Sequence, residues 1–290
     1  MLAPSPAKLS APPSLDHLFI VVSADTLAAI NRCPLLTNET LGRFTIQESE
    51  STLIGRYAPT RIFGQNTFIE LFPDRFGEGQ FAEISCGVVV SFGQVGDHVA
   101  ARRRLAAAEL LFEAELLLRR QGPDNQLGPW YHSTRPAVGG PLALFMSEVT
   151  PEYRAHLGAP VGSDGRLQRG AYLAASLKRP QPLGALAEDI DRVGLRLTPA
   201  RAERVASALT AMGYGRADAG GEIRLTGPDV QLRLQSASDG AAEGVREVQM
   251  RLRSSHAPRR FEFGGASLEL SPRGLNDARA VWRFEPLRLG

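Results

Sequence analysis

Hydrophobic and polar positions divide the first half of the chain into two successive units of similar order. In the first unit, residues 14–76, a continuous apolar run at Leu18–Val22 predicts a buried strand, and helical spacing predicts a helix over Ala24–Arg32. Three further strand patterns follow at Phe44–Glu48, Ser51–Tyr57 and Thr67–Phe72. The predicted order of this unit is therefore strand, helix and three strands.

The second unit, residues 84–150, repeats this order. Its first strand is predicted at Gly87–Phe92, and Asp97 is the expected N-cap of a long helix over Val99–Arg120. Two strands follow at Trp130–Thr134 and Leu142–Val149. A repeated order of elements indicates a duplicated module.

The remainder of the chain is expected to hold a connector and a second α+β half. Residues 151–183 are rich in Gly, Pro, Ala and Arg, which is typical of a connector with some local structure, and the connector is placed at 156–186. In residues 187–290, a strand is predicted at Asp191–Leu197 and a helix at Pro199–Met212. Further strands are predicted at Gly221–Leu225, Asp229–Leu234, Val245–Arg253, Arg260–Phe263, Ala266–Leu270 and Ala280–Phe284. Domain boundaries are thus expected at 1–13 (a flexible leader), 14–155, 156–186 and 187–290.

Composition and charge exclude several classes of protein. Of 290 residues, 43% are hydrophobic and 22% charged, which is ordinary for a globular protein. A formal net charge of +2 argues against a nucleic-acid scaffold. No apolar run approaches the roughly 20 residues that span a bilayer, and residues 1–13 lack the apolar core of a secretory signal. We therefore expect a cytoplasmic protein without nucleic-acid or membrane partners.

The residues most suggestive of chemistry are His17 and Glu70. His17 opens the first predicted strand, and Glu70 lies in the last strand of the same unit. If these strands are neighbours in a curved sheet, the imidazole and the carboxylate can point into one concavity and bind a divalent metal. The alternative is a strand histidine bonded to a backbone carbonyl and a glutamate on a solvated face. A glutamate that faces an interior, however, needs a cation or a hydrogen-bond donor.

Two short motifs carry a resemblance to a known superfamily. Leu15-Asp-His-Leu-Phe-Ile20 and Gly64-Gln-Asn-Thr-Phe-Ile-Glu-Leu-Phe72 resemble the vicinal oxygen chelate superfamily of glyoxalase-like, bleomycin-resistance and dioxygenase-like proteins. A little-characterised glyoxalase-like group looks closer, since it shares a segment like Met146-Ser-Glu-Val-Thr-Pro-Glu-Tyr153. The resemblance implies an α+β fold of tandem βαβββ modules in curved mixed sheets, with a related C-terminal half. Metal ligands are expected at the start of the first strand and in the fourth.

The resemblance also implies a ligand set that spans both modules. Aligned by eye, Glu148 takes the place of Glu70 in the second module, and Cys86 or its neighbour Ser85 takes the place of His17. The expected metal ligands are His17, Glu70 and Glu148, with a position that lacks the family's usual histidine or glutamine. One histidine with two carboxylates suits Fe(II), Mn(II), Ni(II) or Zn(II).

Further residues are expected around the metal. His132 or Glu148 would move a proton, and arginines would bind a substrate carboxylate. For each of these residues the alternative is plain core packing or a surface position. The expected substrate-binding residues are Arg56, Tyr57, Phe63, Phe68 and Tyr131, together with Arg61 and Phe145.

The sequence leaves four functions open. The first is a metal-dependent lyase or isomerase that stabilises an enolate or oxyanion of a small organic substrate. The second is an Fe(II) dioxygenase, and the third is a protein of the same fold that binds a small molecule without turnover. The fourth is a purely structural role, which a pocket closed by side chains would indicate. A homodimer is left open, because the C-terminal half can pack across the first cavity within one chain or between two. The chain lacks the phosphate-binding loop, the nucleophile elbow and the His-Glu-x-x-His motif.

Overall fold

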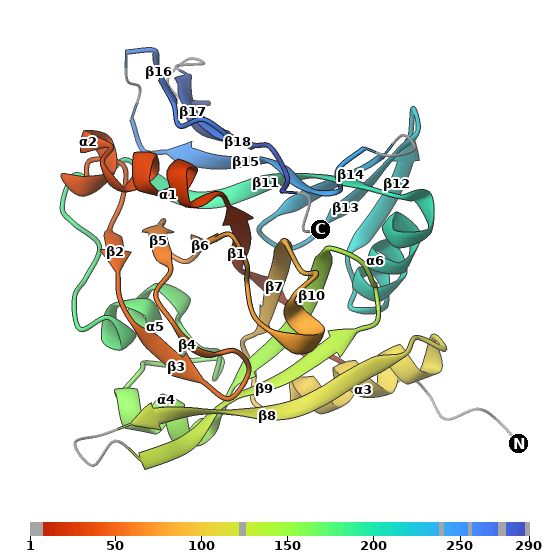
Figure 1. Cartoon of the computed structure of the whole chain (residues 1–290). Helices are drawn as coiled ribbons and strands as arrows, with labels where there is room; N and C mark the ends of the chain where they lie inside the picture. The colour runs from red at the N-terminus through yellow and green to blue at the C-terminus, as the bar shows by residue number, and fades with distance from the viewer. Residues whose placement is uncertain (1–7, 122–125, 238–240, 255–256, 272–276, 288–290) are drawn as a thin grey trace, which may run out of the picture.

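The computed structural model describes residues 8–121, 126–237, 241–254, 257–271 and 277–287. The chain forms two curved mixed sheets that lie one above the other in Figure 1, and helices α1 (Ala24–Asn31), α3 (Asp97–Ala107) and α6 (Pro199–Ala211) share the core between them. The predicted α+β fold of tandem βαβββ modules is therefore confirmed. None of the described helices is long and apolar enough to cross a membrane.

The first sheet contains both N-terminal modules. Its strand order is β2-β5-β6-β1-β7-β10-β9-β8-β3-β4. The two modules meet where β1 pairs antiparallel with β7, and in each module the first strand pairs parallel with the last. The elements of this sheet are β1 (Ser14–Val22), α1 (Ala24–Asn31), α2 (Pro34–Thr37), β2 (Phe44–Ile46), β3 (Ser49–Ser51), β4 (Gly55–Tyr57), β5 (Thr60–Phe63), β6 (Phe68–Pro73), η1 (Gly79–Phe81), β7 (Cys86–Phe92), α3 (Asp97–Ala107), β8 (Phe112–Gln121), β9 (Gln126–Pro136) and β10 (Leu142–Val149).

The second sheet repeats the arrangement in the C-terminal half. Its order is β12-β13-β14-β11-β15-β18-β17-β16, so that β11 and β15 meet at its centre as β1 and β7 do in the first sheet. Two helices, α4 (Pro151–Leu157) and α5 (Arg169–Ser176), belong to the stretch of chain that connects the last strand of the first sheet to the first strand of the second. The elements of the second half are β11 (Ala187–Leu197), α6 (Pro199–Ala211), β12 (Gly215–Ala219), β13 (Glu222–Thr226), β14 (Gln231–Ser236), β15 (Gly244–Leu252), β16 (Arg259–Glu262), β17 (Ala266–Ser271) and β18 (Arg279–Phe284).

The two faces of the first sheet are buried against different partners. One face joins the second sheet and the helices in a continuous aliphatic core, which includes Leu18, Val88 and Leu144 together with Val193 and Leu232. The opposite, concave face carries mainly aromatic side chains. Strands buried on both faces read as continuous apolar runs, as Leu18–Val22 does. The concave face is where the candidate site lies.

The predicted helix over Val99–Arg120 is wrong in its second half. Helix α3 ends at Ala107, Glu109 adopts a left-handed backbone with φ of 56°, and Phe112–Gln121 pairs antiparallel with β9. The leucines of this segment recur at helical spacing, but pairing along the whole strand outweighs that local preference. This correction places the side chains of β8 on the wall of the concave face.

Two smaller expectations also differ from the structure. The strand predicted over Ser51–Tyr57 is a hairpin of β3 and β4, which Gly55 permits with a φ of 72°. Within the expected leader, residues 1–7 lie outside the described residues, but Leu9 is buried and Ser10 donates two hydrogen bonds to Asp97 Oδ1. The described end of the leader therefore packs on the fold. Asp97 is the first residue of α3, and Gly96 is its N-cap.

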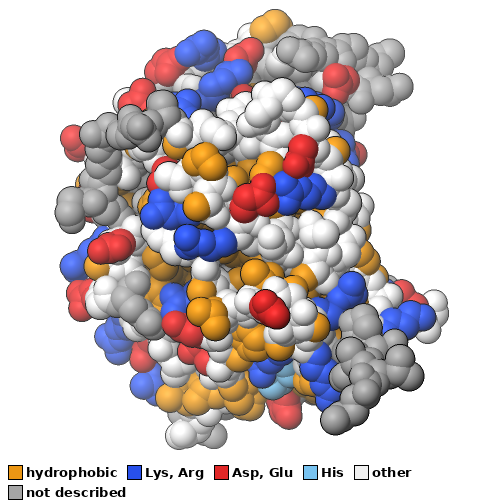
Figure 2. Space-filling model, turned by 90° about the vertical axis from the view of Figure 1, so that its right-hand side faces the viewer, with side chains coloured by type: hydrophobic (Ala, Val, Ile, Leu, Met, Phe, Trp, Pro, Cys, Tyr) orange, Lys and Arg blue, Asp and Glu red, His pale blue; other side chains and the backbone are white. Residues whose placement is uncertain are grey.

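The outer surface mixes charges of both signs. On the face shown in Figure 2, basic and acidic side chains are interspersed, and hydrophobic side chains gather towards its lower part. Many arginines of the second sheet are paired with nearby carboxylates, as Arg233 is with Glu222 and Arg283 with Glu269. This distribution agrees with the small formal net charge of +2.

Candidate functional site

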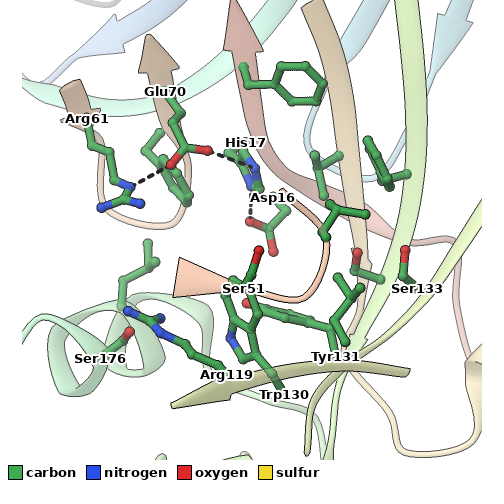
Figure 3. Close-up of a pocket in the computed structure, with 18 of the residues that line it drawn as sticks. Asp16, His17, Ser51, Arg61, Glu70, Arg119, Trp130, Tyr131, Ser133 and Ser176 are labelled. Atoms are coloured by element: carbon green, nitrogen blue, oxygen red, sulfur yellow. Dashed lines mark hydrogen bonds and ion pairs between the residues drawn. The ribbon is translucent and has the colours of Figure 1, made fainter. Parts of the chain in front are cut away.

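A cavity of about 140 Å³ lies on the concave face of the first sheet. Strands of both modules form its floor and walls, and α5, which belongs to the stretch of chain that connects the two sheets, covers one side. Figure 3 shows His17 and Glu70 at one end of this space, and Trp130, Tyr131 and Arg119 at the other. The cavity is therefore polar at both ends and lined by apolar side chains between them.

The sequence correctly predicted that His17 and Glu70 lie close together. Parallel pairing of β1 with β6 sets His17 beside Phe68 and Phe19 beside Glu70. His17 Nε2 lies 3.8 Å from Glu70 Oε2, and both side chains are largely buried, with 19% and 9% of their area exposed. The ring of Phe68 stacks on the imidazole at 4.4 Å. Packing thus holds the imidazole with its Nε2 edge towards the carboxylate.

A bulge in β1 brings Asp16 into the same cavity. The register of β1 on β7 shifts between Leu15 and His17, so Asp16 is an extra residue on its strand. Asp16 and His17 consequently both line the cavity, although they are adjacent in sequence. His17 Nδ1 donates a hydrogen bond of 2.7 Å to Asp16 Oδ1. Because this bond holds the proton on Nδ1, the lone pair on Nε2 faces Glu70.

Glu70 has a cationic partner from the neighbouring strand. Arg61 of β5 donates from Nε to Glu70 Oε1 at 2.8 Å, and its Nη2 donates to Ser49 Oγ at 3.3 Å. This pair meets the requirement that a buried carboxylate be compensated. Burial raises the pKa of the nearby Tyr57 phenol, and the charge of Glu70 raises it further.

Helix α5 supplies the second ion pair of the cavity. Arg169 forms an ion pair with Asp16, and its guanidinium lies over the Tyr172 ring. Burial alone would raise the pKa of Asp16, but Arg169 and the hydrogen bond from His17 outweigh it and lower the pKa. Tyr172 shares a hydroxyl–hydroxyl hydrogen bond of 2.5 Å with Tyr131. Burial, reinforced by Tyr153, raises the pKa of Tyr172 to about 12, so its hydroxyl stays protonated at neutral pH.

Among the described residues, the first and last strands of the second module offer no ligands that match His17 and Glu70. The cavity-facing positions of these two strands are Gly87 and Val89 on β7 and Phe145 and Ser147 on β10. Gly87 has no room for a side chain, because an added Cβ would lie 2.0 Å from the Phe19 ring. The expected alternative ligand, Cys86, belongs to the aliphatic core between the sheets, and burial raises its thiol pKa to about 12.

The prediction that Glu148 joins His17 and Glu70 is wrong by one residue. Ser147 faces the cavity, and Glu148 points to the opposite face, because side chains alternate along a strand. There Glu148 is fully buried, and it accepts hydrogen bonds from the backbone N–H groups of Gly96 at 2.8 Å and His98 at 2.9 Å. His98 Nδ1 also lies 3.1 Å from Glu148 Oε2. Glu148 therefore anchors the first turn of α3.

His132, the expected proton carrier, also lies on that opposite face. It pairs with Glu148 across β9 and β10, and its ring stacks on His98 at 3.9 Å. Its strand neighbours Tyr131 and Ser133 line the cavity instead. His132 is consequently separated from His17 and Glu70 by the sheet.

The His98–His132 stack predicts a pH-dependent loss of stability. Burial lowers the pKa of His132, and the adjacent His98 lowers it further, against opposing effects of Glu148 and Glu152. A group whose pKa is lower in the folded protein than in the unfolded protein stabilises the fold at pH values above its unfolded pKa. For histidine the unfolded pKa is about 6.5. That contribution is lost as pH falls below about 6.5 towards the folded pKa. In urea unfolding between pH 7 and pH 5, His132→Asn should lose less stability than the wild type; equal losses would contradict this.

Of the remaining residues that the sequence predicted to bind substrate, all but Arg56 line the cavity. The cavity is lined by Tyr57, Phe63, Phe68 and Tyr131, and also by Arg61 and Phe145. Arg56 is not part of it, because its side chain is 87% exposed and pairs with Glu50. Residues that the sequence did not single out are Asp16, Arg119, Trp130, Ser133, Arg169 and Tyr172.

The donor atoms fit a divalent ion with two protein ligands. Two ligands that are each about 2.0–2.2 Å from one ion lie roughly 3–4 Å apart, and His17 Nε2 and Glu70 Oε2 are separated by 3.8 Å. Asp16 orients the histidine as carboxylates behind metal-bound histidines do. Within the described ranges, no group of three or more His, Cys, Asp and Glu side chains is placed to hold a metal. Further ligands would have to come from substrate or water.

Comparison with solved structures supports the fold assignment. A hypothetical protein from Staphylococcus aureus has a TM-score of 0.53 and 9% identity, over 89% of this chain and 98% of that one. The Mn(II)-bound glyoxalase from Novosphingobium aromaticivorans has a TM-score of 0.50 and 10% identity, over 93% of this chain and 81% of that one. At these identities the likeness concerns the fold alone, which is the glyoxalase-like fold.

Comparison by sequence identifies the family. No curated protein matches the sequence. The model of a family of unknown function, DUF5829, matches residues 15–284, which include both sheets. The chain therefore belongs to the DUF5829 family.

Proposed function

We propose that the protein is a metal-dependent enzyme that binds a divalent ion through His17 and Glu70 and acts on a small organic substrate. The observation that carries this proposal is the arrangement of three side chains, in which Asp16 holds His17 Nδ1 and leaves Nε2 facing Glu70. The glyoxalase-like fold supports it, since the similar glyoxalase from Novosphingobium aromaticivorans is Mn(II)-bound. Fe(II), Mn(II), Ni(II) and Zn(II) all suit such ligands.

The chain's own residues have separate parts in this chemistry. A divalent ion at these ligands would supply Lewis-acid polarisation of substrate oxygens. Arg61 fixes Glu70 through Oε1 and leaves Oε2 towards His17. The Tyr131–Tyr172 hydroxyl pair remains protonated and can donate a hydrogen bond to an oxyanion or enolate as it forms. Apolar walls, among them Phe19 and Val89, keep bulk water from the reacting atoms.

Lyase or isomerase chemistry suits the cavity best. A metal that only polarises its substrate needs no oxidant, and the tyrosine hydroxyls can stabilise negative charge. Dioxygenase chemistry would require Fe(II) with two open positions. We propose a small-molecule substrate as the only ligand besides the metal, with no nucleic-acid or membrane partner and a cytoplasmic location.

The second candidate is a protein that binds the same small molecule without turnover. The specific observation in its favour is that Arg61 already neutralises Glu70, while the second module presents Gly87, Val89, Phe145 and Ser147. A cation near a carboxylate opposes the binding of a second cation there. Ligand binding of equal strength with and without metal would favour this candidate.

Metal content tests the proposal. The wild-type protein, purified mildly and reconstituted with each of the four ions in turn, should contain close to one divalent ion per chain by elemental analysis. His17→Ala and Glu70→Ala should each lose it, because one remaining protein ligand holds an ion poorly.

His132→Ala is the matched control for the loss of an imidazole. His132 lies behind the sheet, so that variant should keep the metal. A wild type that takes up none of the four ions would overturn the metalloenzyme proposal and leave the binding protein. Metal that persists in both His17→Ala and Glu70→Ala would show that the ion binds at another site.

A further inference from the structure

The charges that line the cavity do not balance. Its lining contains three arginines, Arg61, Arg119 and Arg169, and two carboxylates, Asp16 and Glu70. Arg61 pairs with Glu70, and Arg169 pairs with Asp16. Among the described residues, no carboxylate lies within ion-pair distance of Arg119. With His17 neutral, the lining has one excess positive charge, and it resides on Arg119.

Arg119 is held in place but keeps most of its donors available. Its guanidinium lies 5.1 Å from the centre of the Trp130 ring and donates one hydrogen bond of 3.4 Å to the Tyr153 hydroxyl. A guanidinium carries five N–H donors in a planar fork that matches a carboxylate. The described part of the chain shows no other hydrogen bond from this side chain. The fork is therefore oriented by packing and free to bind an anion.

Other polar groups of the lining also lack partners. Trp130 Nε1 and Ser133 Oγ are buried without a hydrogen-bond partner among the described residues. Buried polar groups are normally satisfied, so unpaired donors in a cavity indicate a ligand that supplies acceptors. Trp130 enters the cavity at a second bulge, where Leu117 and Leu118 of β8 pair with Tyr131 and Pro129 of β9.

The space between Arg119 and His17 is apolar and partly aromatic. Leu117, Phe19, Val89 and Phe145 line it, and Figure 3 shows Arg119 on the side opposite the His17–Glu70 pair. A ligand that reaches both ends needs an anionic group at one end and an apolar body. At about 140 Å³, the cavity suits a body close to the size of one aromatic ring.

We propose that Arg119 and Trp130 form an anion subsite that selects small aryl or similarly planar carboxylates as ligands of this cavity. The carboxylate would bind the Arg119 fork, the ring would lie against the apolar lining, and the far end would approach His17 and Glu70. The inference deepens the proposed function and rests on it only in placing the reacting end of the ligand at those two residues. The subsite itself requires no metal.

Calorimetric titration of the EDTA-treated wild type with phenylacetate tests the subsite, with phenylacetamide as the neutral counterpart. Phenylacetate should bind saturably below about 10 mM, and phenylacetamide about tenfold more weakly or not at all. Arg119→Met, which keeps the length of the side chain, should weaken phenylacetate binding by about 10- to 100-fold. Arg120→Met removes a neighbouring charge that does not line the cavity, and it should bind phenylacetate as the wild type does.

The outcomes separate this inference from the proposed function. Equal affinity for acid and amide, equal weakening in Arg119→Met and Arg120→Met, or no saturable binding of phenylacetate to the wild type would each overturn the anion subsite. None of these results involves metal, and the metal content of Arg119→Met should match that of the wild type. Loss of metal in His17→Ala with intact phenylacetate binding would support both proposals.

Discussion

Replacing Glu148 by alanine is expected to lower the free energy of unfolding by about 3–5 kcal/mol, because each of the two buried donors left without an acceptor costs about 1–3 kcal/mol. Glu148 is fully buried and accepts hydrogen bonds from the backbone N–H groups of Gly96 and His98. Its removal would strand both donors in the first turn of α3 and leave a cavity beneath the helix. Gly96 provides no side-chain cap that could replace the carboxylate. Urea unfolding of the variant measures the loss.

Two further variants test whether the loss of stability arises from the Glu148 carboxylate and from the face of β10 on which it lies. Glu148→Gln keeps the shape of the side chain but not its charge, and a smaller loss of about 1–2 kcal/mol is expected. Ser147→Ala changes the preceding residue, which faces the cavity, and should alter stability by less than about 1 kcal/mol. A loss in Glu148→Ala no larger than in Ser147→Ala would contradict the anchoring role. Loss of metal in Glu148→Ala, with stability intact, would restore Glu148 as a ligand.

Replacing Asp16 by asparagine is expected to weaken metal binding about 10- to 100-fold, the usual effect of losing the partner of a metal-bound histidine. The charged carboxylate fixes the proton of His17 on Nδ1 and leaves the Nε2 lone pair directed towards the metal position. Asparagine retains an acceptor but not the charge, so the histidine becomes a weaker and less oriented ligand. Titration of metal-free protein with Mn(II), with free Mn(II) followed by electron paramagnetic resonance, measures the change.

Loss of the Asp16–Arg169 ion pair is a separate effect of that substitution and needs its own control. Arg169→Gln removes the same ion pair but keeps the hydrogen bond from His17 to Asp16. Both variants should therefore lose stability, because each leaves one buried charge without its partner. Only Asp16→Asn should lose metal affinity by the stated factor. Equal affinities in the two variants would show that Asp16 acts through folding alone.

The sequence predicted the approach of His17 and Glu70 because the strand patterns that carry them are local and regular. His17 begins an apolar strand, and Glu70 interrupts another, so their approach follows from parallel pairing of the first and fourth strands. Asp16 was not predicted because a bulge brings it to the cavity, and bulges have no clear sequence pattern. Arg169 and Tyr172 lie in a segment whose composition suggested only a connector.

The error at Glu148 has a different origin. Strand β10 is buried on both faces, so the run Leu142–Val149 shows no alternation that would tell one face from the other. An alignment that is wrong by one residue then moves every side chain to the opposite face. Arg119 was misassigned for a related reason, since the leucines of β8 recur at a spacing that suits a helix. Both errors required the strand register for their correction.

Proton NMR of the Co(II)-loaded protein tests most directly whether His17 binds a metal through Nε2. A paramagnetic ion at Nε2 should shift the Nδ1 proton of His17 far outside the normal range, and Asp16 should slow its exchange enough for it to be seen in H₂O and lost in D₂O. We expect one such resonance in the wild type and in His132→Ala, and none in His17→Ala. A spectrum without a shifted exchangeable resonance, or one that His17→Ala retains, would contradict a metal site at His17 and Glu70.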